Sequence, residues 1–378
     1  MKLVALVVAW GTVAALSGSA LADRGRSFDH EGIMVPGTDL RIQIDRVMMV
    51  LEVEQNSIRA PIPIALAPGF ADIPISAQRV RRVGEDVEIT VEQNCSKPLR
   101  LKMPVAHLRA RIANVRGLKH HKARRFDQAI GEFEAALGLD PTAAVIASNL
   151  ACAQALAGLS EVAATTLEVL GKRNPAWVTW RLAADPDLLS ITAHPNLAAF
   201  VTRSPGSVTL AELEHARIAI SPHQLVAYRR TVVSHGNGVS VDVVRLADSR
   251  TGAVLVDLSV RSGQQRTIAK SVLSILGFVT EGIVVATVPD EMSEYFRARM
   301  VRKLAETGMQ VVFSRSGTRV TAGSRVVASE PLRDMRDDDL MPARWVASVP
   351  GVIVLSTYAP DRRGCIAATY DARVVPDK

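Results

Sequence analysis

Three histidines in the C-terminal region, beyond residue 207, with a serine and an aspartate nearby, are the residues best suited to chemistry. His215, His223 and His235 lie close in sequence to Ser234 and Asp242. A serine nucleophile, a histidine base and an orienting carboxylate would together make a hydrolytic triad. The sequence has no Gly-x-Ser-x-Gly turn to present such a serine and no Walker phosphate loop. We therefore predict no catalytic residues, with an envelope hydrolase sited in this region as the alternative.

The spacing of acidic and histidine residues does not match a metal-binding motif. Asp337, Asp338 and Asp339 are consecutive, whereas a calcium loop alternates its oxygen ligands and contains a glycine. His120 and His121 are adjacent, so on a helix their side chains would point about 100° apart and would not share an ion. We therefore predict no metal ligand and no cofactor.

The three cysteines have different surroundings in the sequence. Cys152 lies on the apolar face of a predicted helix, which favours a small buried core residue. Cys95 and Cys365 lie in loop-like sequence, and in an oxidising compartment they could form a disulfide. Sequence alone leaves that pairing open, because a disulfide requires the two Cα atoms to come close.

One region of the chain is predicted to be helical, and in it similar residues recur 34 positions apart. Apolar residues recur every three or four positions in residues 124–139, which predicts a helix with one apolar face. Pro141 and, 34 residues later, Pro175 each follow a predicted helix, where their locked φ ends the winding. The second unit carries the same pattern on Leu150, Cys152, Ala153, Leu156, Val162, Ala163, Thr166, Leu167 and Leu170, with a turn at Gly158 and Leu159.

This pattern resembles the tetratricopeptide repeat, whose unit is also 34 residues long. The resemblance covers about residues 110–177 and implies stacked helix pairs that share one core and bind proteins. The matching positions are Gly117, Ala129, Phe133, Ala136 and Pro141 in the first unit and Ala147, Leu150, Gly158, Ala163 and Pro175 in the second. The chain departs from the family at its early aromatic and tyrosine positions, which are Ala113, His120, Ala147 and Gln154 here.

The resemblance implies that partners bind a concave face formed by the first helix of each pair. In a stacked array that face would present side chains from residues 110–122 and 147–155. The basic residues 119–125 would lie at its end, either as a solvated face or as contacts for a partner's carboxylates. The predicted partner-binding residues are Asn114, Leu118, His121, Lys122, Ser148, Cys152 and Ala155.

The 34-residue spacing breaks after residue 177. A stacked array exposes an apolar end unless something covers it. Trp177 and Trp180 are large enough for that role, and we predict a capping segment that ends near residue 200.

The first 22 residues predict export. Lys2 precedes an apolar run in residues 3–16, and Ala20-Leu21-Ala22 provides a small-x-small cleavage site. Removal of residues 1–22 as a signal peptide would deliver a periplasmic or secreted protein. The net charge of +7 on 378 residues would allow contact with anionic envelope polymers. Export makes nucleic-acid binding an improbable function.

The flanking regions predict β-structure. Residues 40–44 and 87–91 alternate apolar and polar side chains, as a half-buried strand does. Pro61, Pro63, Pro68 and Pro74 exclude a helix and a central strand between them. We predict a β-rich module at residues 23–106, before helical repeats with their cap at residues 107–200.

A Ser-Pro-Gly-Ser stretch predicts a linker at residues 201–207. Residues 216–260 weakly resemble one β-propeller blade, carried by Ser221-Pro222, Val241-Asp242-Val243 and Thr251-Gly252. Predicted helices at residues 264–276 and 291–307 make a full propeller unfavourable. An α+β domain at residues 208–378 fits this pattern.

The sequence therefore predicts an α+β multidomain protein with a β-rich N-terminal module, a tetratricopeptide-like helical array and a C-terminal α+β domain. We expect an exported, non-catalytic protein-interaction or scaffold protein that binds its partner through the helical groove. A hydrolase-like envelope enzyme and a binder of anionic envelope polymers are the alternatives.

Overall fold

The structure, a computed structural model, divides into two compact units, residues 1–202 and 203–378. The division falls at the predicted linker, and each unit is described by itself. The described residues are 32–45, 50–62, 75–93, 96–201, 208–233, 240–260, 263–281, 283–288, 300–304, 308–314, 317–331, 344–349, 352–359 and 369–376.

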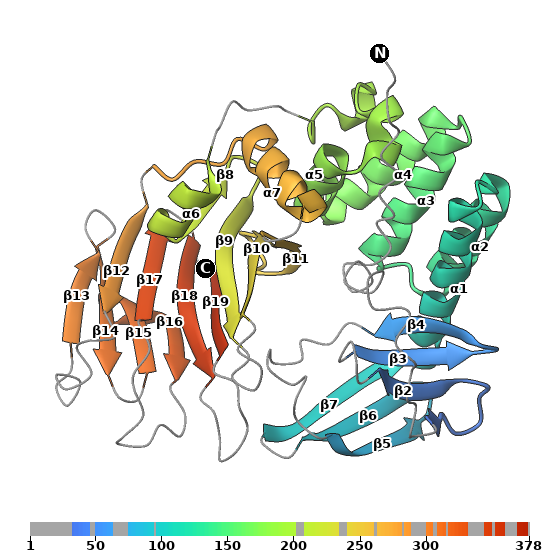
Figure 1. The fold of residues 1–378 in the computed structure, drawn as a ribbon, viewed down its shortest axis with the longest axis horizontal. Helices are drawn as coiled ribbons and strands as arrows, with labels where there is room; N and C mark the ends of the chain where they lie inside the picture. Colours follow the sequence, from blue (N-terminus) through green and yellow to red (C-terminus); the bar gives the residue numbers. More distant parts are fainter. Residues whose placement is uncertain are drawn as a thin grey trace. The chain divides into compact units, whose positions relative to one another are not determined.

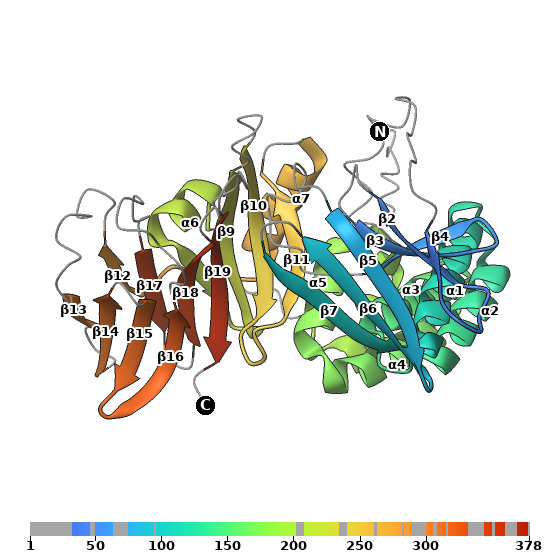
Figure 2. The ribbon, with the colours of Figure 1, turned by 90° about the horizontal axis from the view of Figure 1, so that it is seen from below.

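The first unit begins with two antiparallel sheets (Figures 1 and 2). One has the order β1-β2-β3-β4 and the other β5-β6-β7. Pro61 lies on β4, at an edge of its sheet, where its missing N–H leaves no ladder bond unmade. The strands are β1 Ile33–Met34, β2 Arg41–Asp45, β3 Val50–Gln55, β4 Ile58–Ile62, β5 Ile75–Val83, β6 Asp86–Gln93 and β7 Ser96–Pro104.

The two sheets and the first helix share one core. Leu51 and Ile89, from different sheets, are fully buried in the same apolar cluster as Leu108 and Ile112 of α1 (Val105–Lys122). α1 follows β7 directly and packs against β4. The predicted boundary at residues 106 and 107 therefore does not separate two cores, because one face of α1 completes the β-core.

Helices fill the remainder of the first unit, each packed on the next (Figure 1). The turns after α1 and α3 are built alike, 34 residues apart. Arg124 and Gly158 both have positive φ, at 58° and 83°, and each donates its N–H three residues back, to His121 and Ala155. The helices are α2 Phe126–Leu139, α3 Ala144–Leu156, α4 Ser160–Arg173 and α5 Pro175–Ala184, followed by the 3₁₀ turns η2 Pro186–Ile191 and η3 Pro195–Leu197.

Gly117 of α1 allows the close approach of α2. A Cβ atom at this position would lie 2.5 Å from the ring of Phe133, which is fully buried. In the second pair the equivalent position is Ala151, which shares a core cluster with the smaller Leu167. The glycine is thus matched to the phenylalanine ring.

We expect Gly117→Ala to lower the free energy of unfolding by about 1–2 kcal/mol. Alanine gains about 1 kcal/mol of helix propensity, but crowding a well-packed core costs more than that. In a Phe133→Leu background the same substitution is expected to be neutral or stabilising. Urea unfolding of the four proteins measures both effects, and an equal loss in the two backgrounds would contradict the packing argument.

The second unit is mainly antiparallel sheet. Its larger sheet runs β11-β10-β9-β19-β18-β17-β12, with β8 also paired to β9, and a separate sheet runs β13-β14-β15-β16. Phe313 of β14 and Ile353 of β18 share an apolar cluster, so the two sheets pack against each other. The strands are β8 Ile218–Ser221, β9 Leu225–Val233, β10 Ser240–Asp248, β11 Val254–Ser259, β12 Val284–Val288, β13 Met300–Leu304, β14 Met309–Ser314, β15 Gly317–Ala322, β16 Arg325–Pro331, β17 Arg344–Val349, β18 Val352–Ala359 and β19 Thr369–Pro376.

In the part of the second unit that the structure describes, two helices accompany these strands, α6 Leu210–Ala216 and α7 Gly263–Ile275. α7 confirms the helix predicted at residues 264–276. The hydroxyl of Ser221, the last residue of β8, donates to the carbonyl of Leu276, directly after α7, at 2.5 Å. The helix predicted at residues 291–307 is wrong for Met300–Leu304, which pairs with β14 as a strand. Cross-strand pairing of alternating side chains decides that segment more than its helical spacing does.

The chain thus combines helices with antiparallel sheets, as an α+β protein does. Among the described residues, none of the helices has the length and apolar character needed to cross a membrane.

Candidate functional site

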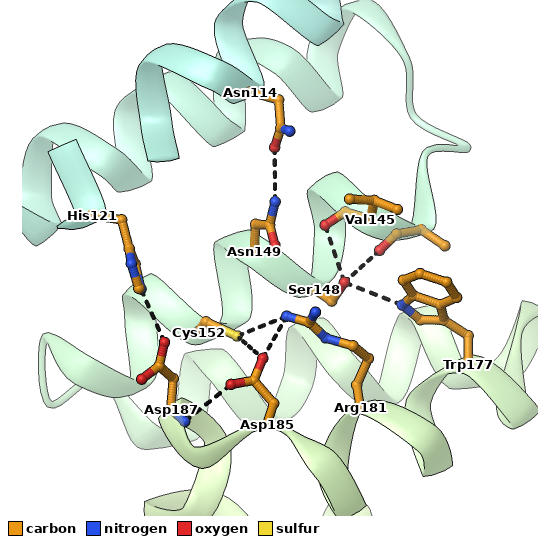
Figure 3. Close-up of polar contacts among 11 residues, drawn as sticks. Asn114, His121, Val145, Ser148, Asn149, Cys152, Trp177, Arg181, Asp185 and Asp187 are labelled. Atoms are coloured by element: carbon orange, nitrogen blue, oxygen red, sulfur yellow. Dashed lines mark hydrogen bonds and ion pairs between the residues drawn. The ribbon is translucent and has the colours of Figure 1, made fainter. Parts of the chain in front are cut away.

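The predicted binding face is formed by one side of α1 and one side of α3. Asn114 of α1 and Asn149 of α3 point toward each other, whereas His121 of α1 points to Asp187 and Cys152 of α3 points to Arg181 and Asp185 (Figure 3). The amide of Asn149 donates to the side-chain oxygen of Asn114 at 2.9 Å. This contact joins the two helices from the inside of the face.

The α3 half of this face is covered by the chain's own cap. Trp177 of α5 donates its indole N–H to the Ser148 hydroxyl at 3.2 Å, and η2 packs along α3. Ser148, Cys152 and Ala155 are consequently buried. The prediction that these three residues contact a partner is wrong for this structure, because the segment expected to close the end of the array lies over them.

Beneath the cap lies a buried ion pair. Arg181 of α5 lies 2.6 Å from a carboxylate oxygen of Asp185, and their side chains are only 5% and 2% exposed. Cys152 joins the pair: its thiol donates to Asp185 at 3.3 Å and its sulfur accepts from Arg181 at 3.4 Å (Figure 3). The ion pair is internal to the cap and meets α3 through Cys152. Loss of either charged partner would leave the other charge buried, which is destabilising by about 3–5 kcal/mol.

The same environment makes Cys152 chemically quiet. Burial, followed by the negative charge of Asp185, raises the pKa of the Cys152 thiol well above its usual range. Because the thiolate is the nucleophilic form, Cys152 is a core residue, in agreement with its position on an apolar helix face.

At the edge of the cap, His121 faces Asp187. The ring Nε2 lies 3.5 Å from an oxygen of Asp187, and the imidazole meets the Phe126 ring edge-on at a centroid distance of 5.7 Å. Burial, with Asp185 as a smaller cause, raises the pKa of Asp187 to about 6. Burial likewise lowers the pKa of His121. Both side chains therefore disfavour their charged forms in the folded protein.

We expect Asp187→Asn to stabilise the protein increasingly as the pH rises. The pKa of Asp187 is about 6 when folded and about 4 when unfolded, so the stability that protonation gives is complete below pH 4 and lost as the pH rises through 6. The variant should match the wild type near pH 4 and exceed it by about 1–3 kcal/mol near pH 8.

Urea unfolding of both proteins at the two pH values measures this difference, in which the contribution of His121 largely cancels. Asp127→Asn, at an exposed position of α2, is the matched control and should show no such pH dependence. A difference between Asp187→Asn and wild type that does not grow with pH would contradict the assignment.

The other predicted contacts are only partly accessible. Asn114, Leu118 and His121 are half-buried, and Lys122 alone of the seven predicted residues is exposed. Leu118 packs on the core between α1 and α3. The α1 side of the face is thus only partly accessible to a partner.

An open groove lies on the opposite side of the array, between α2 and α4 above α3. Its volume is about 500 Å³. Val162 and Val169 of α4 are 48% and 50% exposed along it. The sequence analysis placed Val162 on a buried face, which is wrong, and the seven-residue spacing of the two valines was the signal it missed. The lining is Leu137, Pro141, Ala147, Leu150, Glu161, Val162, Thr165, Thr166, Val169, Leu170 and Arg173.

The alternative hydrolytic site is only partly within the described residues. His223 lies half-buried in the turn between β8 and β9, where its backbone N–H donates to the Ser221 hydroxyl oxygen at 3.2 Å. The side chains of His215 and Asp242, together with Ser234, His235, Cys95, Cys365, Asp337, Asp338, Asp339 and residues 1–22, lie outside the part that the structure describes.

Within the described ranges, no group of three histidine, cysteine or acidic side chains is placed to hold a metal ion. Comparison with models of known families, with curated proteins and with solved structures finds no match. The site must therefore be interpreted from its own geometry.

Proposed function

We propose that the protein is an exported, non-catalytic scaffold whose tetratricopeptide-like helical array binds another protein. The observation that carries this proposal is the groove over α3. Its walls are mostly aliphatic, and the two half-exposed valines of α4 are its most accessible apolar side chains. Apolar area of this kind stabilises a complex in proportion to the area that a partner covers.

The charged residues at the two ends of the groove would orient a partner. Glu161 stands at the first turn of α4, and Arg173 at its last residue. Arg173 also donates to the Pro141 carbonyl at 3.4 Å, which directs its side chain across the groove. Rim charges of this kind affect register and association rate more than affinity.

The cap over the α1–α3 face also supports the α2–α4 groove as the binding site. With Ser148, Cys152 and Ala155 under the cap, the groove between α2 and α4 offers a partner an accessible apolar surface on another side of the helices. The proposal therefore keeps protein binding by the helices and moves it from the α1–α3 face to the α2–α4 side.

We expect Val162→Asp/Val169→Asp to abolish partner binding without unfolding the protein. Both side chains are half-exposed, whereas a carboxylate facing an apolar partner would be buried without a counter-charge. Capture from the extracytoplasmic fraction with each protein as bait measures the loss. The matched control is Leu189→Asp in η2, at a side chain that is 64% exposed and does not line the groove.

The supporting result is a protein captured by the wild type and by Leu189→Asp but not by the double variant. A partner that both variants retain would contradict the groove as the binding site. Circular dichroism and thermal melting of each bait separate lost binding from lost folding.

A second candidate function is binding of anionic envelope polymers, and one observation favours it. The β5-β6-β7 sheet, which Figure 2 shows as a ribbon, carries exposed basic side chains on one face. In the sequence these residues are spread over more than twenty positions. Arg79 and Arg100 both pair in register with Thr90 of β6, so they lie on one face. Arg81 and Lys102 flank Glu88 in the next row.

Acidic side chains of β6 lie among these basic ones. Arg81 pairs with Glu88, and Lys102 lies 3.1 Å from Asp86. The exposed side chains of Arg79 and Arg100 lie on the same surface, to either side of Thr90. A polymer with phosphate or carboxylate groups at intervals would find cations at matching intervals there.

We expect Arg79→Ser/Arg100→Ser to weaken binding to polyphosphate about thirtyfold at low salt, because two ionic contacts of about 1 kcal/mol each are lost. Wild-type binding should fall as NaCl is added, since exposed charges are screened. Fluorescence anisotropy with labelled polyphosphate measures both effects. Lys119→Ser/Arg125→Ser is the matched control, because it removes the same charge from another surface. Equal losses in the two double variants would contradict a site on the sheet and attribute the binding to net charge alone.

A further inference from the structure

One face of α4 carries charged and apolar side chains in an order that complements its own reverse. Glu161 begins the face, Val162 and Thr165 follow, and Val169 and Arg173 complete it. At 100° per residue the last four lie within about 80° of one another around the helix, and all five side chains are exposed. The buried side of α4 is separate, formed by Ala163, Ala164, Leu167, Leu170 and Gly171.

Two such helices match when they run antiparallel. Reversal about a twofold axis near Thr165 brings Val162 opposite Val169 of a second copy. Glu161 of one copy then lies at the same end as Arg173 of the other, offset by about three residues or 4.5 Å along the helix axis, which these two long side chains can span. A parallel pairing would instead place Glu161 against Glu161 and Arg173 against Arg173. Antiparallel packing therefore pairs each acid with a base and each valine with a valine, whereas parallel packing sets like charges together.

The groove beside this face has the position that such a pairing needs. α4 forms one of its walls, the end of α2 the other, and Ala147 and Leu150 of α3 lie between them. A second α4 in the groove would contact α4 on one side and α2 on the other. By symmetry, the first α4 would occupy the groove of the second copy, which is an isologous twofold contact.

We propose that the groove between α2 and α4 binds the α4 helix of a second copy of this chain, giving an antiparallel, twofold-symmetric dimer. This inference rests on the proposed function only in taking the groove to be a protein-binding surface. From Glu161 to Arg173 the contact is about 18 Å long. Glu161 already lies 2.8 Å from His194, and Lys172 pairs with Glu168 at 3.1 Å, so Arg173 is the basic residue best placed to reach Glu161 of the second copy.

Charge reversal tests this arrangement through the oligomeric state of the full chain. Sedimentation velocity should show a dimer for the wild type. Arg173→Glu and Glu161→Arg should each weaken dimerisation by about tenfold or more, because each change creates two like-charge contacts across the twofold axis. An equimolar mixture of the two variants should recover the dimer, since every acid then faces a base of the other chain.

Lys172→Glu is the matched control, because this exposed residue of α4 does not line the groove, and it should leave the dimer intact. Thr165→Cys is a second measurement that does not depend on charge. Near the axis, two copies of this cysteine should form a disulfide on mild oxidation and give a species of doubled mass absent from the parent protein.

A wild type that stays monomeric at high concentration would overturn the dimer proposal, as would a mixture of the charge variants that remains as weakly associated as each alone. Neither result would affect the capture experiment with Val162→Asp/Val169→Asp, which tests binding of other proteins to the groove. Partner capture by a monomeric wild type would assign the groove to a different protein.

Discussion

The buried ion pair between Arg181 and Asp185 is the interaction on which the helical unit depends. Two charges removed from water are stabilised only while each remains the partner of the other. Cys152 lies against both, where its small sulfur accepts from the guanidinium and its thiol donates to the carboxylate. α5 and η2 are thus fixed on α3 by polar contacts with demanding geometry as well as by apolar packing. The cap is an integral part of the core of the array.

This constraint decides which surface of the array is accessible. A cap that merely covered the end of the stack would have left the α1–α3 face open. Here the cap lies along the α1–α3 face, and the Trp177 indole donates a hydrogen bond to Ser148 in the first half of α3. The accessible apolar surface lies instead beside α4, where Val162 and Val169 face the groove. Both proposals concerning the groove follow from this difference: the α1–α3 face is covered by the cap, and the side beside α4 is accessible.

The β-strands show the same relation between local pattern and distant contact. Alternation in residues 40–44 and 87–91 predicted β2 and β6, because a half-buried strand has a period of two. The register of β5, β6 and β7 then brought Arg79 and Arg100 to either side of Thr90. These arginines are scattered in the sequence and neighbours on the sheet. Their proximity is a property of strand pairing, which no short stretch of sequence contains.

The sequence by itself determined the local elements. Helical spacing predicted α1 to α4, and the 34-residue interval predicted the turn at Gly158, because these features depend on side chains three or four positions apart. It also located the cap, since an exposed apolar end requires one. Only the tertiary structure decided that α1 belongs partly to the β-core, that Met300–Leu304 is a strand, and that the cap lies over Ser148 and Cys152. Those outcomes depend on contacts between segments distant in the chain, and the periodicity of a single segment contains no information about which distant segment will cover it.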